Sequence, residues 1–229
     1  MNLNDLYKKL SDTPIEDFPS SALSGLLHGY LSIYSMVRVN PWLEEVYGSQ
    51  WDIHERIREI AGELADLVKD PSVAVEDRVG HVADLMETYL MHSDMDFLDI
   101  ALDAAYEIIS PEGSDRIVLP CRTPEMCRLL CSCYYFTNEE ECAKLVEDIV
   151  VRKFRESPDF ALFVKDNWEW YRAVEFYHNI MGEKNNFLRQ HDIREKEYLD
   201  NVANTKDVIE YLCRRFDQLA TGENELLKN

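Results

Sequence analysis

Glycine is scarce in this chain, with eight residues among 229. Their spacing forms neither a phosphate-binding loop nor a dinucleotide-binding turn. The sequence also lacks Gly-x-Ser-x-Gly, His-Glu-x-x-His and Cys-x-x-Cys, which mark hydrolase nucleophiles, zinc proteases and zinc or redox sites. These absences argue against most nucleotide-dependent, serine-hydrolase and zinc-protease activities. Catalysis by residues gathered from distant helices stays open.

Basic residues are few relative to acidic ones. The chain has 24 Lys and Arg against 44 Asp and Glu, for a formal net charge of −20. Binding to nucleic acid draws on Lys and Arg that neutralise phosphates, and anionic membranes select for the same residues. The composition therefore predicts no nucleic-acid partner and no membrane partner. It favours a basic protein partner instead.

Long apolar runs are also missing. No stretch reaches the about 20 apolar residues that a membrane helix needs, and the first residues do not show a basic segment followed by an apolar one. No Asn-x-Ser/Thr sequence occurs. We therefore expect a cytoplasmic protein whose six cysteines are reduced thiols.

What the chain has is helical periodicity. Apolar residues return every three to four positions, for example at Ile53, Ile57, Ile60, Leu64 and Leu67. No run of alternating β-branched residues and no Asn-Gly or Asp-Gly turn suggests a hairpin of strands. The sequence predicts an all-α fold of about ten helices, as an αα-hairpin array or an irregular bundle.

Helix ends carry recognisable signals. Ser49 to Asp52 reads as a capping box, and Asp70-Pro71 ends the helix that follows. Thr123-Pro124-Glu125 predicts another helix start, since it combines a cap, a proline at the first position and an acid in the first turn. The segment Thr137-Asn138-Glu139-Glu140 predicts the next start by the same reasoning.

A weak internal repeat joins two of these regions. The segment from Leu85 to Ala105 matches that from Leu129 to Ile149 at an offset of 44 residues, and each copy contains a helix, a cap and a second helix. In architecture this resembles the hairpins of tetratricopeptide-like or α/α-toroid proteins. We expect residues 1–229 to form a single all-α unit, with a possible subdivision into 1–156 and 157–229.

Aromatic residues concentrate at positions 160–178. Trp168 and Trp170 are two apart, so on a helix they point about 200° apart and cannot both face one core. Ordinary packing in two layers explains most of such a cluster, but large aromatics with polar tips also dominate binding sites. The candidate ligand-binding residues are Trp168, Trp170, Arg172, Glu175 and His178.

Metal-binding patterns are weak. Glu175 and His178 share the Glu-x-x-His spacing of di-iron bundles, but a second such pair is missing. Five cysteines from Cys121 to Cys142 fit small buried residues better than metal ligands, because paired Cys-x-x-Cys spacing is absent. We predict no metal site and no cofactor.

The favoured functional hypothesis is a non-enzymatic protein-interaction module that engages a basic partner. One alternative is a carbohydrate-active enzyme on an α/α-hairpin scaffold, which needs two carboxylates opposed across an aromatic cleft. The other is a helical-bundle metal-binding protein that uses Glu175 and His178. Catalytic residues and the oligomeric state are not indicated by the sequence.

Overall fold

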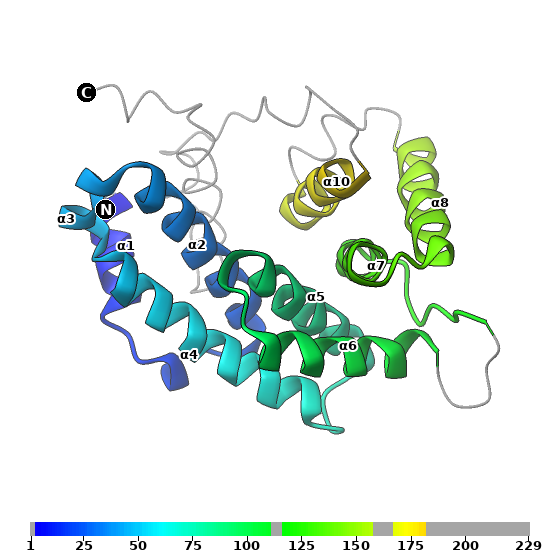
Figure 1. Ribbon diagram of the computed structural model, residues 1–229, viewed down its shortest axis with the longest axis horizontal. Coiled ribbons are helices and arrows are strands. Elements are labelled where there is room, and N and C mark those ends of the chain that lie inside the picture. Colours follow the sequence, from blue (N-terminus) through cyan, green and yellow to red (C-terminus); the bar gives the residue numbers. More distant parts are fainter. Residues whose placement is uncertain (1–2, 111–115, 158–166, 182–229) are drawn as a thin grey trace. The chain divides into compact units, whose positions relative to one another are not determined.

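The computed structural model describes residues 3–110, 116–157 and 167–181 (Figure 1). Within these ranges it contains nine α-helices, two short 3-10 helices and no strand. The prediction of an all-α fold is therefore confirmed. The chain divides into two compact units, and the boundary falls inside α4, between residues 64 and 65. A single unit over 1–229, or a subdivision at 156 and 157, stays a prediction.

The first unit, described over residues 3–64, combines two long helices, α2 and α4, with shorter elements. Its elements are α1 (Leu3–Ser11), η1 (Ile15–Asp17), α2 (Ser20–Val39), η2 (Pro41–Leu43), α3 (Glu44–Tyr47) and the first part of α4 (Gln50–Lys69). Gly48 joins α3 to α4 with a φ of 90°, a left-handed conformation that a residue with a Cβ rarely adopts. This turn lets α4 begin directly after α3.

The helix α4 follows the sequence prediction closely. Ile53, Ile57, Ile60 and Leu64 are at most 2% exposed, as their common stripe requires. The amide of Asp52 donates to the Ser49 hydroxyl, which confirms the cap. In a capping box the Asp52 carboxylate would accept from the backbone amide of Ser49. Here it accepts from the Ser49 hydroxyl instead.

In the described part of the second unit, residues 65–192, α7 (Pro124–Thr137) packs between α5 (Val75–His92) and α10 (Trp168–Met181). Two further helices cover this row: α6 (Met95–Ile109) packs against α5, and α8 (Glu140–Glu156) packs against α7. The connections α5–α6 and α7–α8 are tight, so each pair is an αα-hairpin (Figure 1).

The two hairpins turn in the same way. Ser93 after α5 has φ 55° and ψ 30°, and Asn138 after α7 has φ 56° and ψ 29°. Both residues are left-handed helix ends. The start predicted over Thr137-Asn138-Glu139-Glu140 falls at Glu140, but Thr137 and Asn138 do not cap it. Thr137 is the last residue of α7 and donates its hydroxyl to the Cys133 carbonyl. The N-cap residue of α8 is Glu139.

Candidate functional site

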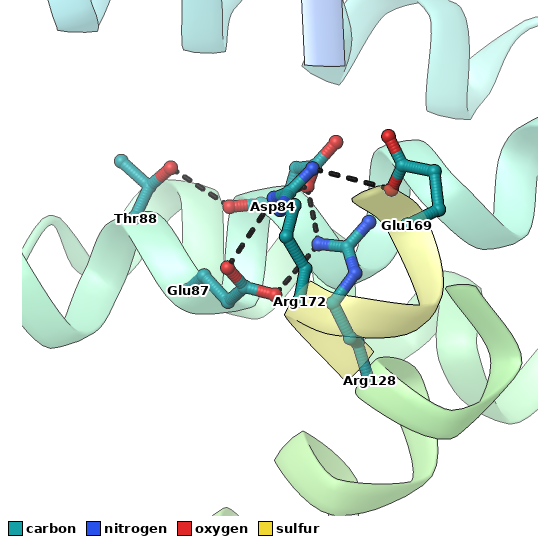
Figure 2. Close-up of polar contacts among 6 residues, drawn as sticks. All are labelled: Asp84, Glu87, Thr88, Arg128, Glu169 and Arg172. Atoms are coloured by element: carbon teal, nitrogen blue, oxygen red, sulfur yellow. Dashed lines mark hydrogen bonds and ion pairs between the residues drawn. The ribbon is translucent and has the colours of Figure 1, made fainter. Parts of the chain in front are cut away.

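The first candidate site is a group of five charged side chains, the buried charge cluster, which comes from α5, α7 and α10. Its members are Asp84 and Glu87 on α5, Arg128 on α7, and Glu169 and Arg172 on α10 (Figure 2). Asp84, Arg128 and Arg172 are 2%, 1% and 3% exposed. Charged residues are almost never buried to this degree unless they are paired.

Arg128 holds the two acids of α5 together. One of its terminal nitrogens lies 2.6 Å from the Asp84 carboxylate and 2.6 Å from that of Glu87. Arg172 approaches the same acids at 3.3 Å and 3.7 Å and reaches Glu169 at 3.5 Å. Figure 2 shows both guanidinium groups directed at Asp84 from different helices.

The electrostatics favour full ionisation of both arginines. Burial lowers the pKa of Arg128, but Asp84 and Glu87 outweigh burial and raise that pKa well above its ordinary value. Burial and the charge of Arg128 lower the pKa of Arg172, and the carboxylates, led by Glu169, hold it above the ordinary value. The cluster therefore acts as a charged clamp across α5, α7 and α10. Nε of both arginines is buried without a hydrogen-bond partner among the described residues.

Local sequence does not reveal the cluster, but Asp84 and Arg128 directly precede the two copies of the repeat. Arg128 follows Asp84 by 44 residues, and Arg172 follows Arg128 by 44. Residues 79–115 contain nine acids and no Lys or Arg, and Asp84 and Glu87 take their countercharge from α7 and α10. The offset-44 match was therefore the signal that could have placed these side chains side by side.

Two of the residues predicted from the sequence to form a site, Trp170 and Arg172, have different surroundings. Arg172 belongs to the buried charge cluster. Lys153 of α8 instead lies over the Trp170 ring, with 5.3 Å between Lys153 Nζ and the ring centroid. Glu175 and His178 are half-buried, and His178 meets Tyr177 edge to face. Trp168 opens α10, and its side chain lies outside the described set. Arg172 and Trp170 therefore do not converge on one site.

The cysteine group is part of the core. Cys127, Cys131, Cys133 and Cys142 are completely buried, and Cys121 is half-buried. Burial raises the pKa of Cys127 and of Cys131, and the neighbouring Cys142 thiol together with burial raises that of Cys133. Thiols held protonated in this way are poor nucleophiles and poor metal ligands.

The outer face of α6 provides a second candidate site, the α6 acidic face. It consists of Asp96, Asp99, Asp103 and Glu107, all exposed and spaced three or four residues apart. The helix has no Lys or Arg. Glu107 pairs with Arg78 at 3.3 Å, and the other three make no ion pair in the part of the chain that the structure describes.

The described ranges were compared with the side-chain groups that hold metals and with the helices that span membranes. No group of three or more His, Cys, Asp or Glu side chains gathers there in a metal-binding arrangement. None of the helices in those ranges combines the length and apolarity required to span a bilayer.

No known protein family, curated protein or solved structure matches this chain.

Proposed function

We propose that this protein is an interaction module that binds a basic partner protein through the α6 acidic face. The observation that carries the proposal is the uncompensated charge of that face. Asp99 has Asp96 and Asp103 as its i−3 and i+4 neighbours, and like charges at such spacings destabilise a helix by about 0.2–0.5 kcal/mol per pair. A partner with Lys and Arg side chains would relieve this repulsion.

Apolar side chains flank the acids and suit a protein partner. Tyr106 is 39% exposed and Met95 is 52% exposed, at opposite ends of α6. Tyrosine and methionine are enriched at protein interfaces, where they supply contact area within a polar rim. The α6 acidic face thus combines steering charge with two apolar contacts.

The buried charge cluster supports the same proposal indirectly. Its carboxylates are occupied by Arg128 and Arg172 at short range, which is the arrangement of a structural clamp. The exposed acids of α6 are therefore better placed than the buried ones to meet a partner.

The test uses a lysine-rich peptide as a defined basic probe, with affinity measured by calorimetry at low and high salt. The triple variant Asp96→Asn, Asp99→Asn, Asp103→Asn should bind more weakly and with a smaller salt dependence. The control variant removes three exposed acids of α8 instead: Glu140→Gln, Glu141→Gln, Glu147→Gln. Equal losses of affinity in the two variants would show that binding depends on net charge alone, and would contradict the α6 acidic face as the binding site.

A further inference from the structure

A pocket adjoins the C-terminal end of the α6 acidic face, within the second unit. It has a volume of about 350 Å³, near the lower end of the range for small-ligand sites, roughly 300–1,000 Å³. Its described lining comes from the start of α5, the end of α6 and the connection that precedes α7. The lining residues are Val75, Arg78, Glu107, Ile108, Val118 and Pro120.

Most of this described lining is apolar, and part of it is open to solvent. Val75 is 39% exposed and Val118 is 49% exposed. A ligand can therefore reach both side chains from solution without any movement of the core. Burying exposed aliphatic surface of this kind against another apolar group is favourable, because it removes that surface from water.

The connection before α7 is held against α6 by its backbone. The Val118 amide donates to the Ile109 carbonyl oxygen at 2.8 Å. Val118 and Pro120 are exposed, and the residues before and between them are half-buried. Such alternation is typical of an extended chain that packs on one side. Val118 and Pro120 thus form a wall of the pocket whose position is tied to the end of α6.

The exposed charges that α5 and α6 place beside the pocket are acidic. Arg78, the one arginine in the described lining, lies 3.3 Å from the Glu107 carboxylate and is compensated by it. Asp103 is exposed one turn before Glu107 on α6. Glu76 and Asp77 are exposed in the first turn of α5. An aliphatic ligand that also carries positive charge would therefore gain electrostatic attraction here.

We infer that the basic partner anchors itself by inserting an aliphatic side chain into this pocket, next to Lys or Arg residues that lie along the α6 acidic face. The inference rests on the proposed function, since the pocket and that face share Glu107. Acids four residues apart on α6 are separated by about 6 Å along the helix. Side chains on one face of an extended chain repeat about every 6.6 Å. An extended segment with an aliphatic residue and then Lys at every second position therefore matches the pocket, Asp103 and Asp99 in turn.

The test uses three short peptides and calorimetry with the full-length protein. The first peptide has a leucine followed by lysines at every second position, with serines between them. The second replaces the leucine by serine, and the third replaces the lysines by glutamates. The leucine-lysine peptide should bind about 10-fold more tightly than the serine-lysine peptide, a ratio that we call the leucine advantage. The leucine-glutamate peptide should bind much more weakly, because the acidic face repels it.

A matched pair of variants tests the pocket itself. Val118→Ser removes apolar surface at an exposed position, so the chain should fold normally, and the leucine advantage should fall to about threefold or less. The control Val151→Ser changes a valine of α8 that is 37% exposed and lies outside the described lining, and it should keep the full advantage. In NMR spectra of the methyl-labelled protein, the leucine-lysine peptide should shift the Val75 and Val118 methyl resonances.

The inference is overturned if the leucine-lysine and serine-lysine peptides bind the original chain equally, if Val118→Ser keeps the advantage that Val151→Ser keeps, or if the glutamate peptide binds as tightly as the lysine peptide. The triple asparagine variant of the α6 acidic face separates this inference from the proposed function. Loss of affinity in that variant without any leucine advantage would support the acidic face and remove the pocket. A leucine advantage that Val118→Ser abolishes, with no loss in the triple variant, would support the pocket and remove the acidic face.

Discussion

The two helices of the first αα-hairpin use the same residue types in opposite ways. On α5, Asp84 is 2% exposed and lies within 2.6 Å of Arg128. On α6, Asp96, Asp99 and Asp103 are exposed and have no ion-pair partner within the described ranges. Acids of one hairpin thus either hold three helices together or remain available to solvent and partners.

This difference indicates which charged residues contribute to folding stability. A buried carboxylate has lost its hydration and depends on its arginine, whereas an exposed one is solvated and screened by salt. Substitutions in the buried charge cluster should therefore change folding stability. Substitutions on the α6 acidic face should change binding and leave stability nearly constant.

The largest effect is expected from Arg128→Met. It leaves Asp84 and Glu87 buried with less countercharge, so the free energy of unfolding should fall by about 3–5 kcal/mol. Urea denaturation measures this loss. The control is Arg122→Ala, whose pair with Asp148 is exposed on both sides and contributes about 0–1 kcal/mol. Similar losses in the two variants would contradict the buried role of Arg128.

Replacing the four more buried members of the cluster together, with the more exposed Glu169 kept, should cost much less than breaking the cluster at one position. The variant carrying Asp84→Leu, Glu87→Met, Arg128→Met and Arg172→Met removes both signs of charge together. Apolar replacement of a buried ion-pair network is often neutral or stabilising, so this variant should regain most of the stability that Arg128→Met loses. The check is the same urea experiment. Additive losses over the four positions would show that packing dominates over charge.

A smaller effect is expected at His81, one turn before Asp84 on α5. Burial lowers its pKa, and Asp84 and Asp77 oppose that shift only in part. The unfolded chain therefore takes up the proton first as the pH falls. Stability is fully present above the unfolded value of 6.5 and declines as the pH falls from there toward the folded pKa.

The measurement compares urea unfolding at about pH 7.5 and about pH 5.5. The variant His81→Gln should lose less stability over this interval than the original chain. Ile57→Val, a buried substitution without a titrating group, should keep the original pH dependence. If His81→Gln and the original chain lose equal stability, His81 is not the group responsible.

The smallest effect is expected on α6. Asp103→Lys places a lysine four residues after Asp99, the favourable order for a helical ion pair, and four before Glu107. The helix should gain about 0.2–0.5 kcal/mol per pair, measured as a slight rise in the unfolding midpoint. The variant Asp103→Asn removes the repulsion between acids without adding an ion pair, so it measures the first of the two contributions alone. A loss above about 1 kcal/mol would mean that Asp103 has a structural role.

Helix identity and several helix ends could be predicted from local sequence. Thr123 accepts from the Met126 amide, as its position before Pro124 indicates, and α4 ends at Lys69 before Asp70-Pro71. The start predicted over Thr137-Asn138-Glu139-Glu140 falls at Glu140 with Glu139 as its cap, because asparagine suits the left-handed residue that ends a helix as well as an N-cap. Only the left-handed backbone of Asn138 distinguishes the two cases.

The sequence by itself determined an all-α, strongly acidic chain, since helical periodicity and net charge depend on neighbouring residues and on composition. The tertiary structure decided which charges are buried: Asp84 and Arg172 are 88 residues apart and meet at 3.3 Å. It also decided that Val75 and Val118 share one pocket. Such contacts depend on how helices pack, and the one-dimensional pattern of a single helix contains no information about the face of another.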